Sequence, residues 1–195
     1  MRRSIYFITH PDVVISCDVP VTQWPLSARG VARMRQGLRR PWVAEITSIY
    51  CSAERKAIDA ARILAVHLTL GVEQVVELGE NDRSATGFLP APEFEKTAGR
   101  FFADPDAAID GWERAVDAQS RVLTAVTSIA ARDATSGAIA IVSHGAVGTL
   151  LYCKIAGQPI SRRWDQPPNG GGNYFRFTLA PSAAHSWWQA FDEAV

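Results

Sequence analysis

The stretch GAIAIVSHG at residues 137–145 decides the fold class of this chain, because it is an almost continuous apolar run of strand length. A strand without alternating polar residues is buried on both faces, as in a sheet that helices cover on both sides. The run ends on His144. A second apolar stretch, SIYFITHPD at residues 4–12, ends on His10 and is broken by Pro11. We therefore expect two buried strands that each end on a histidine.

Strand and helix patterns alternate along the rest of the chain. We expect further strands over residues 46–51, 72–78 and 173–179, and helices between Ser27 and Pro41 and over 52–71, 93–103, 109–132 and 147–155. Ser27 is the expected N-cap of the first helix, and Gly71 is expected to close the second. The arginines of the first helix are expected to face solvent: Arg29, Arg33, Arg35, Arg39 and Arg40. The alternation predicts an α/β fold, a three-layer α/β/α sandwich with a mostly parallel central sheet.

Length and composition favour one globular domain. The chain of 195 residues can bury a sizeable core, and its turn-rich segment 80–111 is the expected insertion or lid. Lys plus Arg and Asp plus Glu number 20 each, so no net basic field favours nucleic acid or a membrane surface. No apolar segment approaches the ~20 residues of a membrane span. The three cysteines are widely spaced, which fits a reducing cytoplasm. We expect a cytoplasmic protein and leave its oligomeric state open.

The two strand-ending histidines predict a site at one edge of the sheet. Ligands of open α/β sheets collect at the carboxyl ends of the strands, so neighbouring strands would place His10 and His144 together. Arg55 lies in the expected first helical turn after the strand at 46–51, where free backbone N–H groups also favour an anion. Two imidazoles and a guanidinium suit a phosphate group. A structural role for either histidine is the alternative interpretation.

Five segments, in this order, resemble those of the histidine phosphatase superfamily, which has the phosphoglycerate mutase-like fold. FITHPD stands where that family has Arg-His-Gly, and WPLSARG resembles its Leu-(Ser/Thr)-x-x-Gly segment. IYCSAERKAIDAA resembles the segment Tyr-x-Ser-x-x-x-Arg, with Arg55 as the phosphate-binding arginine. AIVSHGAVGTLL resembles Val-(Ser/Thr)-His-Gly, and PPNGGGNYFRFTL resembles the Pro-Asn segment before the last strand. The resemblance extends over about residues 4–180.

The resemblance implies a phosphatase that works through a phosphohistidine. His10 would be the nucleophile, and His144 and Arg55 would stabilise the charge of the transition state. The family's acid lies after the third strand, so Glu80 is the first choice and Asp82 the second. No metal or organic cofactor is implied. The expected ligand is a phosphorylated small molecule or a phosphoprotein.

The chain departs from the family at the nucleophile. Thr9 replaces the arginine before it and Pro11 the glycine after it. Losing one phosphate clamp could cost ~10²–10³ in rate. Arg83, close in sequence to the proposed acid, is expected to supply the missing positive charge. The predicted substrate-binding residues are Thr9, Arg55, Asp82 and Arg83. If the site is weakened by Thr9, a T9R variant should gain activity.

Other functions stay open at this level. A family member that binds a phosphorylated ligand without efficient turnover is the main alternative, because of Thr9 and Pro11. A mutase is less favoured, because the segment 80–111 is not notably basic. A metal hydrolase using His10, Asp12 and His144 offers too few ligands. A serine esterase is disfavoured because Ser143 lacks a Gly-x-Ser-x-Gly turn.

Overall fold

A mixed sheet of seven strands forms the centre of the computed structural model, which describes residues 3–179 and 182–193. The strand order is β3-β2-β4-β1-β5-β6, and β7 pairs with β5. The strands are β1 (Ile5–Thr9), β2 (Ile46–Cys51), β3 (Glu73–Gln74), β4 (Ala138–Ser143), β5 (Asn173–Leu179), β6 (Ser182–Ala184) and β7 (Gln189–Ala190). The helices are α1 (Ala28–Gly37), α2 (Arg55–Leu68), α3 (Ala91–Ala103), α4 (Ala115–Arg132) and α5 (Gly145–Ile155). Short 3-10 turns include η1 (Val21–Gln23), η3 (Val76–Leu78) and η4 (Ile109–Gly111).

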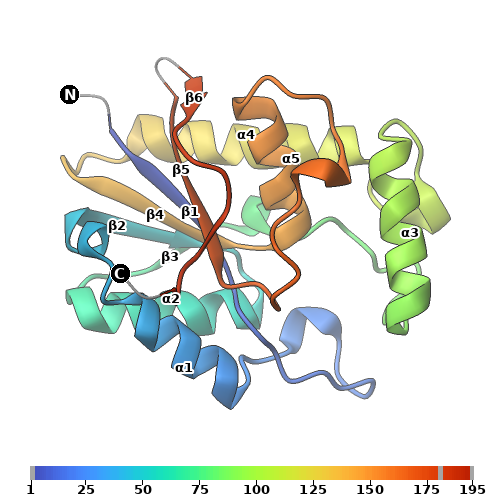
Figure 1. Ribbon diagram of the computed structural model, residues 1–195, viewed down its shortest axis with the longest axis horizontal. Coiled ribbons are helices and arrows are strands. Elements are labelled where there is room, and N and C mark those ends of the chain that lie inside the picture. The colour runs from blue at the N-terminus through green and yellow to red at the C-terminus, as the bar shows by residue number, and fades with distance from the viewer. Residues whose placement is uncertain (1–2, 180–181, 194–195) are drawn as a thin grey trace.

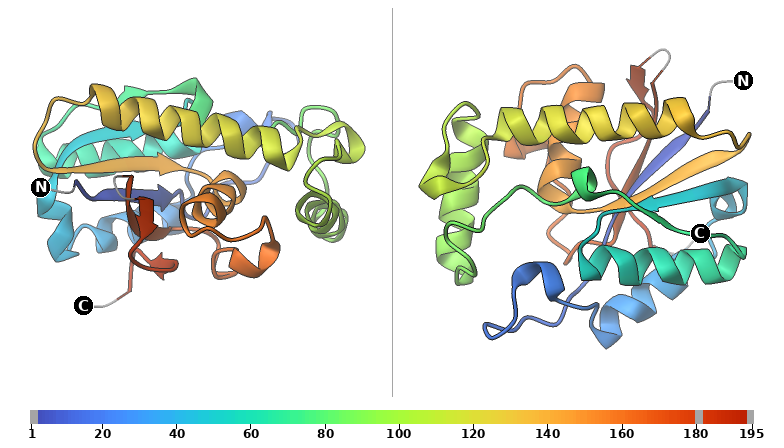
Figure 2. Two further views of the ribbon diagram at one scale, coloured as in Figure 1. Left: turned by 90° about the horizontal axis from the view of Figure 1, so that it is seen from above. Right: turned by 180° about the vertical axis from the view of Figure 1, so that it is seen from behind.

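Helices cover both faces of the sheet, which confirms the predicted three-layer α/β fold (Figure 1). In this view α4 and α5 lie above the strands and α1 and α2 lie below them, and the opposite view shows the same layers (Figure 2). β1 and β4 are buried along their whole length, which explains their unbroken apolar sequences. The core is accordingly divided into two apolar clusters, one on each side of the sheet.

The pairing of β1 with β4 positions the ends of both strands. The two strands are parallel neighbours, and Thr9 is opposite Ser143 in the register. β2 lies on the other side of β4, also parallel to it. β5 is antiparallel to β1. The residues that follow β1, β2 and β4 therefore leave the sheet at one edge.

Three details of the predicted elements are wrong. The strand expected over 72–78 is only Glu73–Gln74, and η3 follows it. Both strand residues are exposed at the edge of the sheet, where water can bind backbone groups that have no partner strand. α2 closes on Thr69 in the left-handed conformation (φ 56°) rather than on Gly71. The helix expected over 109–132 is interrupted after η4, where Gly111 has a φ of 81°.

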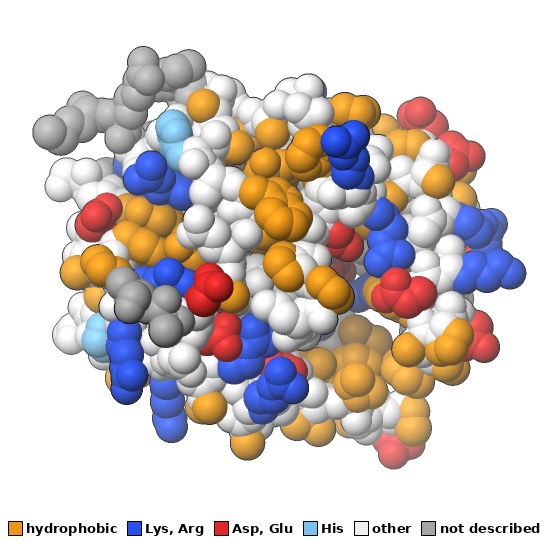
Figure 3. Space-filling model, viewed as in Figure 1, with side chains coloured by type: hydrophobic (Ala, Val, Ile, Leu, Met, Phe, Trp, Pro, Cys, Tyr) orange, Lys and Arg blue, Asp and Glu red, His pale blue; other side chains and the backbone are white. Residues whose placement is uncertain are grey.

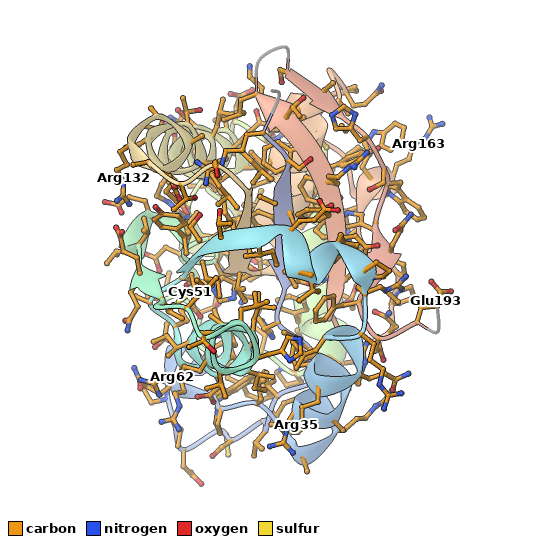
Figure 4. The ribbon with its side chains drawn as sticks, turned by 90° about the vertical axis from the view of Figure 1, so that its left-hand side faces the viewer. Arg35, Cys51, Arg62, Arg132, Arg163 and Glu193 are labelled. Carbon is orange, nitrogen blue, oxygen red and sulfur yellow. The ribbon has the colours of Figure 1, made fainter. Side chains whose placement is uncertain are left out.

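The first helix follows the prediction at its start, but two of the five arginines expected to face solvent do not: Arg33, and Arg40, whose guanidinium donates to the carbonyls of Ala190 and Phe191. The hydroxyl of Ser27 accepts a hydrogen bond from the N–H of Gly30, as an N-cap does. Arg35 points outward as expected (Figure 4). Arg33 is instead buried, because its guanidinium binds Asp12 at 2.8 Å and Asp192 at 2.8 Å. That side chain thus fixes the segment after β1 instead of facing water.

The segment 80–111 includes α3, which stands at one end of the molecule beyond the carboxyl ends of the central strands (Figure 1). Its aromatic residues Phe101 and Phe102 are buried in the apolar cluster that contains α4. The C-terminal tail packs on the domain's own core through Trp188 and Phe191. Across residues 3–179 and 182–193, none of the helices combines the length and apolar character needed to cross a membrane.

Candidate active site

His10 and His144 lie side by side at the carboxyl edge of the sheet. The N–H of His10 donates to the carbonyl of Ser143 at 3.0 Å, which continues the β1–β4 pairing by one residue. The two imidazole rings meet edge to face, with 5.2 Å between their centroids and 70° between their planes. The structure therefore brings together the two histidines that the sequence placed at this edge.

A glycine turn holds His10 at the end of its strand. The carbonyl of His10 accepts a hydrogen bond from the N–H of Gly172 at 3.1 Å. Gly171 has a φ of 78°, and a Cβ there would lie 2.3 Å from the same carbonyl oxygen. Only glycine combines a positive φ with the absence of a Cβ at this position, so the PNGGGN segment is a structural support for His10.

The free nitrogen of His10 is the one that a nucleophile needs. Its Nδ1 lies 2.9 Å from the carbonyl oxygen of Pro11, which can only accept, so Nδ1 carries the proton. Burial lowers the pKa of His10 to about 4. Near neutral pH the ring is thus uncharged, and Nε2 has a lone pair available for attack.

His144 is fully buried and is oriented by two groups from the start of α2. Its Nε2 lies 2.8 Å from the hydroxyl of Ser52 and 3.3 Å from a carboxylate oxygen of Glu54. Burial holds the pKa of His144 well below its usual value, so the ring is neutral. Since an ionised Glu54 only accepts, the proton of His144 belongs on Nε2. Its Nδ1 is buried and has no hydrogen-bond partner among the described residues.

Glu54 is a buried anion at the centre of this cluster. Its carboxylate accepts from Nζ of Lys56 at 2.5 Å and from the N–H of Glu80 at 2.9 Å. Burial alone would raise the pKa of Glu54, but the facing His144 and Lys56 lower it to about 2. The ionised carboxylate therefore connects the strand ends to the loop after η3.

Lys56, and not Arg55, points toward the histidines, which corrects the sequence prediction. Arg55 is half-exposed and binds Asp59, one helical turn along, at 2.8 Å. Lys56 is 3% exposed, and its charge acts on both histidines. The reason is helical geometry, because adjacent residues point about 100° apart.

The two candidate acids lie in different surroundings. The Glu80 carboxylate accepts from the backbone N–H groups of Ala146 and Val147, at 3.2 and 3.0 Å, and so lies next to His144. Asp82 is exposed, and its carboxylate accepts from the N–H of Ser84 at 2.8 Å. Glu80 thus binds the first turn of α5, directly after His144, whereas the Asp82 carboxylate caps its own loop.

Thr9 and Arg83 differ in whether they can reach a ligand. Thr9 is 1% exposed, and its hydroxyl donates to Gln166 at 2.8 Å and accepts from the N–H of Asn173 at 3.0 Å. Arg83 is half-buried over the rings of Phe94 and Trp112, and its charge acts on His10 and His144. Thr9 is thus held inside the fold by its hydrogen bonds, whereas Arg83 is near enough for its charge to act on both histidines.

Asp12 and Ser143, the residues on which the metal hydrolase and serine esterase alternatives depend, both have hydrogen-bond partners in the fold. The Asp12 carboxylate binds Arg33 at 2.8 Å, and the Ser143 hydroxyl is buried and donates to the carbonyl of Leu78 at 2.7 Å. The described part of the chain holds no group of three or more His, Cys, Asp or Glu side chains that could bind a metal ion. Asp12 and Ser143 are therefore each bound to a structural partner.

A hollow of the surface lies between α3 and the segment that contains η1 (Figure 3). Two loops meet beside it, since Trp24 packs edge-on against Phe88 with 5.8 Å between ring centroids. Apolar side chains form the lower margin of the hollow in this view. The segment 80–111 thus contributes Arg83 and Phe88 to the surroundings of the site.

Sequence reasoning missed Glu54, Lys56 and Ser52. Two signals could have found Lys56. Counted from Tyr50 and Ser52, the arginine of the pattern Tyr-x-Ser-x-x-x-Arg falls on Lys56 and not on Arg55. Lys56 also lies one turn before Ala60 on the apolar face of α2. For Glu54 the chain offered no signal, because only the fold places its carboxylate against His144.

Comparison with known proteins identifies the class of this fold and site. The family model of the histidine phosphatase superfamily, branch 1, matches residues 18–185. The chain therefore belongs to the histidine phosphatase superfamily. The match begins after His10, in keeping with the departure of Thr-His-Pro from the family pattern. A comparison with curated proteins gave no match.

Solved structures share the fold at low sequence identity. A mycobacterial glucosyl-3-phosphoglycerate phosphatase in complex with inorganic phosphate is 17% identical with a TM-score of 0.80, covering 98% of this chain and 100% of that one. A phosphoserine phosphatase from Entamoeba histolytica in complex with 3-phosphoglyceric acid is 13% identical with a TM-score of 0.77, covering 98% and 100%. A putative alpha-ribazole-5'-P phosphatase from Escherichia coli is 18% identical with a TM-score of 0.74, covering 100% of both chains.

Proposed function

We propose that this protein is a phosphomonoesterase that works through a phosphohistidine at His10. The observation that carries the proposal is the pair His10–His144, in which His10 offers an unprotonated Nε2 beside a second buried imidazole. Membership of the histidine phosphatase superfamily and the phosphatase names of the structural neighbours support the same reaction class. The substrate is an unidentified small phosphorylated molecule or a phosphoprotein.

The reaction has two displacements at phosphorus. In the first, Nε2 of His10 forms a bond to phosphorus while the bond from phosphorus to the ester oxygen breaks. Glu80 gives its proton to the leaving oxygen, which departs as an alcohol. In the second, a water molecule attacks the phosphohistidine and transfers a proton to Glu80. This step releases phosphate and restores His10.

Positive charge and oriented N–H groups stabilise the phosphoryl group during both steps. Arg83 is the cation best placed for this, since its guanidinium acts on both histidines and has no carboxylate partner among the described residues. Arg83 thereby takes the part that the resemblance would give to an arginine at position 9. Thr9 serves instead as a buried support for Asn173.

The test is hydrolysis of p-nitrophenyl phosphate by the wild type and by His10→Ala, with His185→Ala as the matched control. His185 lies near Thr178 in the C-terminal part of the sheet, away from the proposed nucleophile. Phosphatase activity should be lost in H10A and kept in H185A, and mass spectrometry at alkaline pH should find a phosphorylated His10 peptide. Equal rates in wild type and H10A would exclude the proposal.

A second candidate function is binding of a phosphorylated ligand without turnover. It is favoured by the departure from the family pattern at the proposed nucleophile, where Thr9 and Pro11 replace the arginine and the glycine. Thermal stabilisation by inorganic phosphate, without hydrolysis of any phosphate ester offered, would support this function over the first.

A further inference from the structure

The positive charge of Lys56 is cancelled inside the site. The side chains of Lys56 and Glu54 are 4% and 13% exposed and form a close ion pair at 2.5 Å. Nζ of Lys56 also donates to the carbonyl of Val21 at 2.9 Å, which fixes the ammonium in this position. At the distance of a ligand, two adjacent opposite charges largely cancel each other's field.

The other groups around Glu54 add little positive charge. The charged and titratable groups around Glu54 and the two histidines are Lys56 on α2, Glu80 and Arg83 in the loop after η3, and Arg121 on α4. Both histidines are neutral near neutral pH. Arg121 binds Glu113 at 2.7 Å. The pocket therefore offers at most one uncompensated positive charge, that of Arg83.

One buried ring nitrogen of the site has neither a proton nor a partner among the described residues. Nδ1 of His144 is buried and unpartnered among the described residues, and the proton of this ring lies on Nε2, toward Glu54 and Ser52. A bare buried nitrogen is an acceptor that needs a donor. A doubly charged phosphoryl group has only acceptor oxygens, whereas a singly charged one keeps a P–OH that can donate.

From these features we infer that the site binds the phosphoryl group in its singly charged form, with the P–OH donating to Nδ1 of His144 and the charge matched by Arg83. The inference rests on the proposed function, which places the phosphoryl group beside His10. Glu54 is the residue that sets this preference, because it cancels the charge of Lys56 and leaves no second cation for a doubly charged ligand. Since phosphate monoesters lose their second proton at about pH 6, binding should weaken above that pH.

The first test is calorimetric binding of inorganic phosphate and of sulfate to the wild-type protein at about pH 5.5 and about pH 8.5, values on either side of the second ionisation of a phosphate group. Phosphate should bind about tenfold or more tightly at the lower pH, because the second negative charge gained at the higher pH meets no unpaired cation. Sulfate stays doubly charged and should bind weakly at both. Equal or tighter phosphate binding at the higher pH would overturn the inference, as would sulfate binding as tight as that of phosphate.

Two variants test whether Glu54 causes the preference for a singly charged ligand. Glu54→Gln should raise the affinity for sulfate, and for phosphate at the higher pH, about tenfold or more, since it frees the charge of Lys56. The double variant Glu54→Gln with Lys56→Met removes both charges and should restore the wild-type preference. Glu73→Gln is the matched control, because it removes one carboxylate from an exposed ion pair with Arg132. An unchanged preference in the single variant would contradict the role of Glu54.

Binding and turnover separate the two proposals. If phosphate binds with the stated pH dependence and no ester is hydrolysed, the proposed function fails and the charge preference stands. If esters are hydrolysed through His10 while sulfate and phosphate bind equally well, the charge preference fails and the proposed function stands.

Discussion

The imidazoles of His10 and His144 meet edge to face at 5.2 Å because β1 and β4 are parallel neighbours in register. The chain places these residues far apart in sequence, and one backbone hydrogen bond from His10 to Ser143 brings them together. The predictions below concern the protonation of the two histidines, the charged residues around them and the residues that support His10.

Stability should fall as the pH drops from about 6.5 to about 4. The folded-state pKa of His10 is about 4, below the ordinary 6.5, so in this range the unfolded chain binds a proton that the folded protein does not. Stability is thus present above pH 6.5 and lost on acidification, and His144, whose pKa is also lowered, acts in the same direction. Urea unfolding across this range measures the loss. His10→Asn should flatten the curve, and an equally steep curve would contradict the assignment.

Lys56→Met should destabilise the fold far more than Arg55→Met. The first substitution leaves the carboxylate of Glu54 buried without its cation, which costs about 3 kcal/mol or more. The second removes a half-exposed ion pair with Asp59, and exposed pairs contribute about 1 kcal/mol or less. Comparison of the free energies of unfolding in urea checks the difference. Similar losses in both variants would show that Lys56 is not the buried partner.

Glu80→Gln should lower kcat by about 10² or more with substrates that leave as simple alcohols, because the proton donor is lost. The loss should be much smaller with p-nitrophenyl phosphate, whose leaving group needs no proton. Asp82→Asn is the control, since its exposed carboxylate caps the N–H of Ser84. A larger kcat loss in D82N than in E80Q would transfer the acid role to Asp82.

Thr9→Arg should destabilise the protein and should not show the gain of activity that a site weakened by Thr9 would give. Thr9 is 1% exposed and its hydroxyl is bound to Gln166 and Asn173, so an arginine has no room there. Thr9→Ala should cost about 1–3 kcal/mol, because the buried N–H of Asn173 loses its acceptor. Thr9→Ser keeps the hydroxyl and should remain near wild type. Increased phosphatase activity in a folded T9R protein would refute this interpretation.

Gly171→Ala should displace His10 and reduce activity, whereas Gly87→Ala should have a small effect. Both glycines have positive φ, 78° and 62°, so both variants carry backbone strain of roughly 1 kcal/mol. At Gly171 the new Cβ would also lie 2.3 Å from the carbonyl oxygen of His10, while at Gly87 it would meet nothing within 4 Å. Thermal unfolding and kcat measured on both variants separate the steric effect from the strain. Equal losses of stability and kcat in the two variants would contradict the supporting role of Gly171.

The strongly patterned elements could be predicted from the sequence, and the weakly patterned ones could not. The apolar strands β1 and β4 and the Ser27-capped helix α1 lie where local pattern put them. The short edge strand β3 and the antiparallel strands β6 and β7 were missed or misjudged, because their pairing depends on neighbours distant in the chain. The histidines of the site followed from strand ends, and the identity of its buried cation did not.

The sequence by itself determined the α/β class, because continuous apolar runs alternate with amphipathic helices, and it determined that two histidines end the central strands. Only the tertiary structure decided the electrostatics of the site. Whether a charged side chain of α2 faces water or the pocket depends on the rotation of that helix against the sheet, which turned Arg55 outward and Lys56 inward. The charge of Glu54 was then fixed by its partners, since burial opposes its ionisation while His144 after β4 and Lys56, two residues along the chain, favour it.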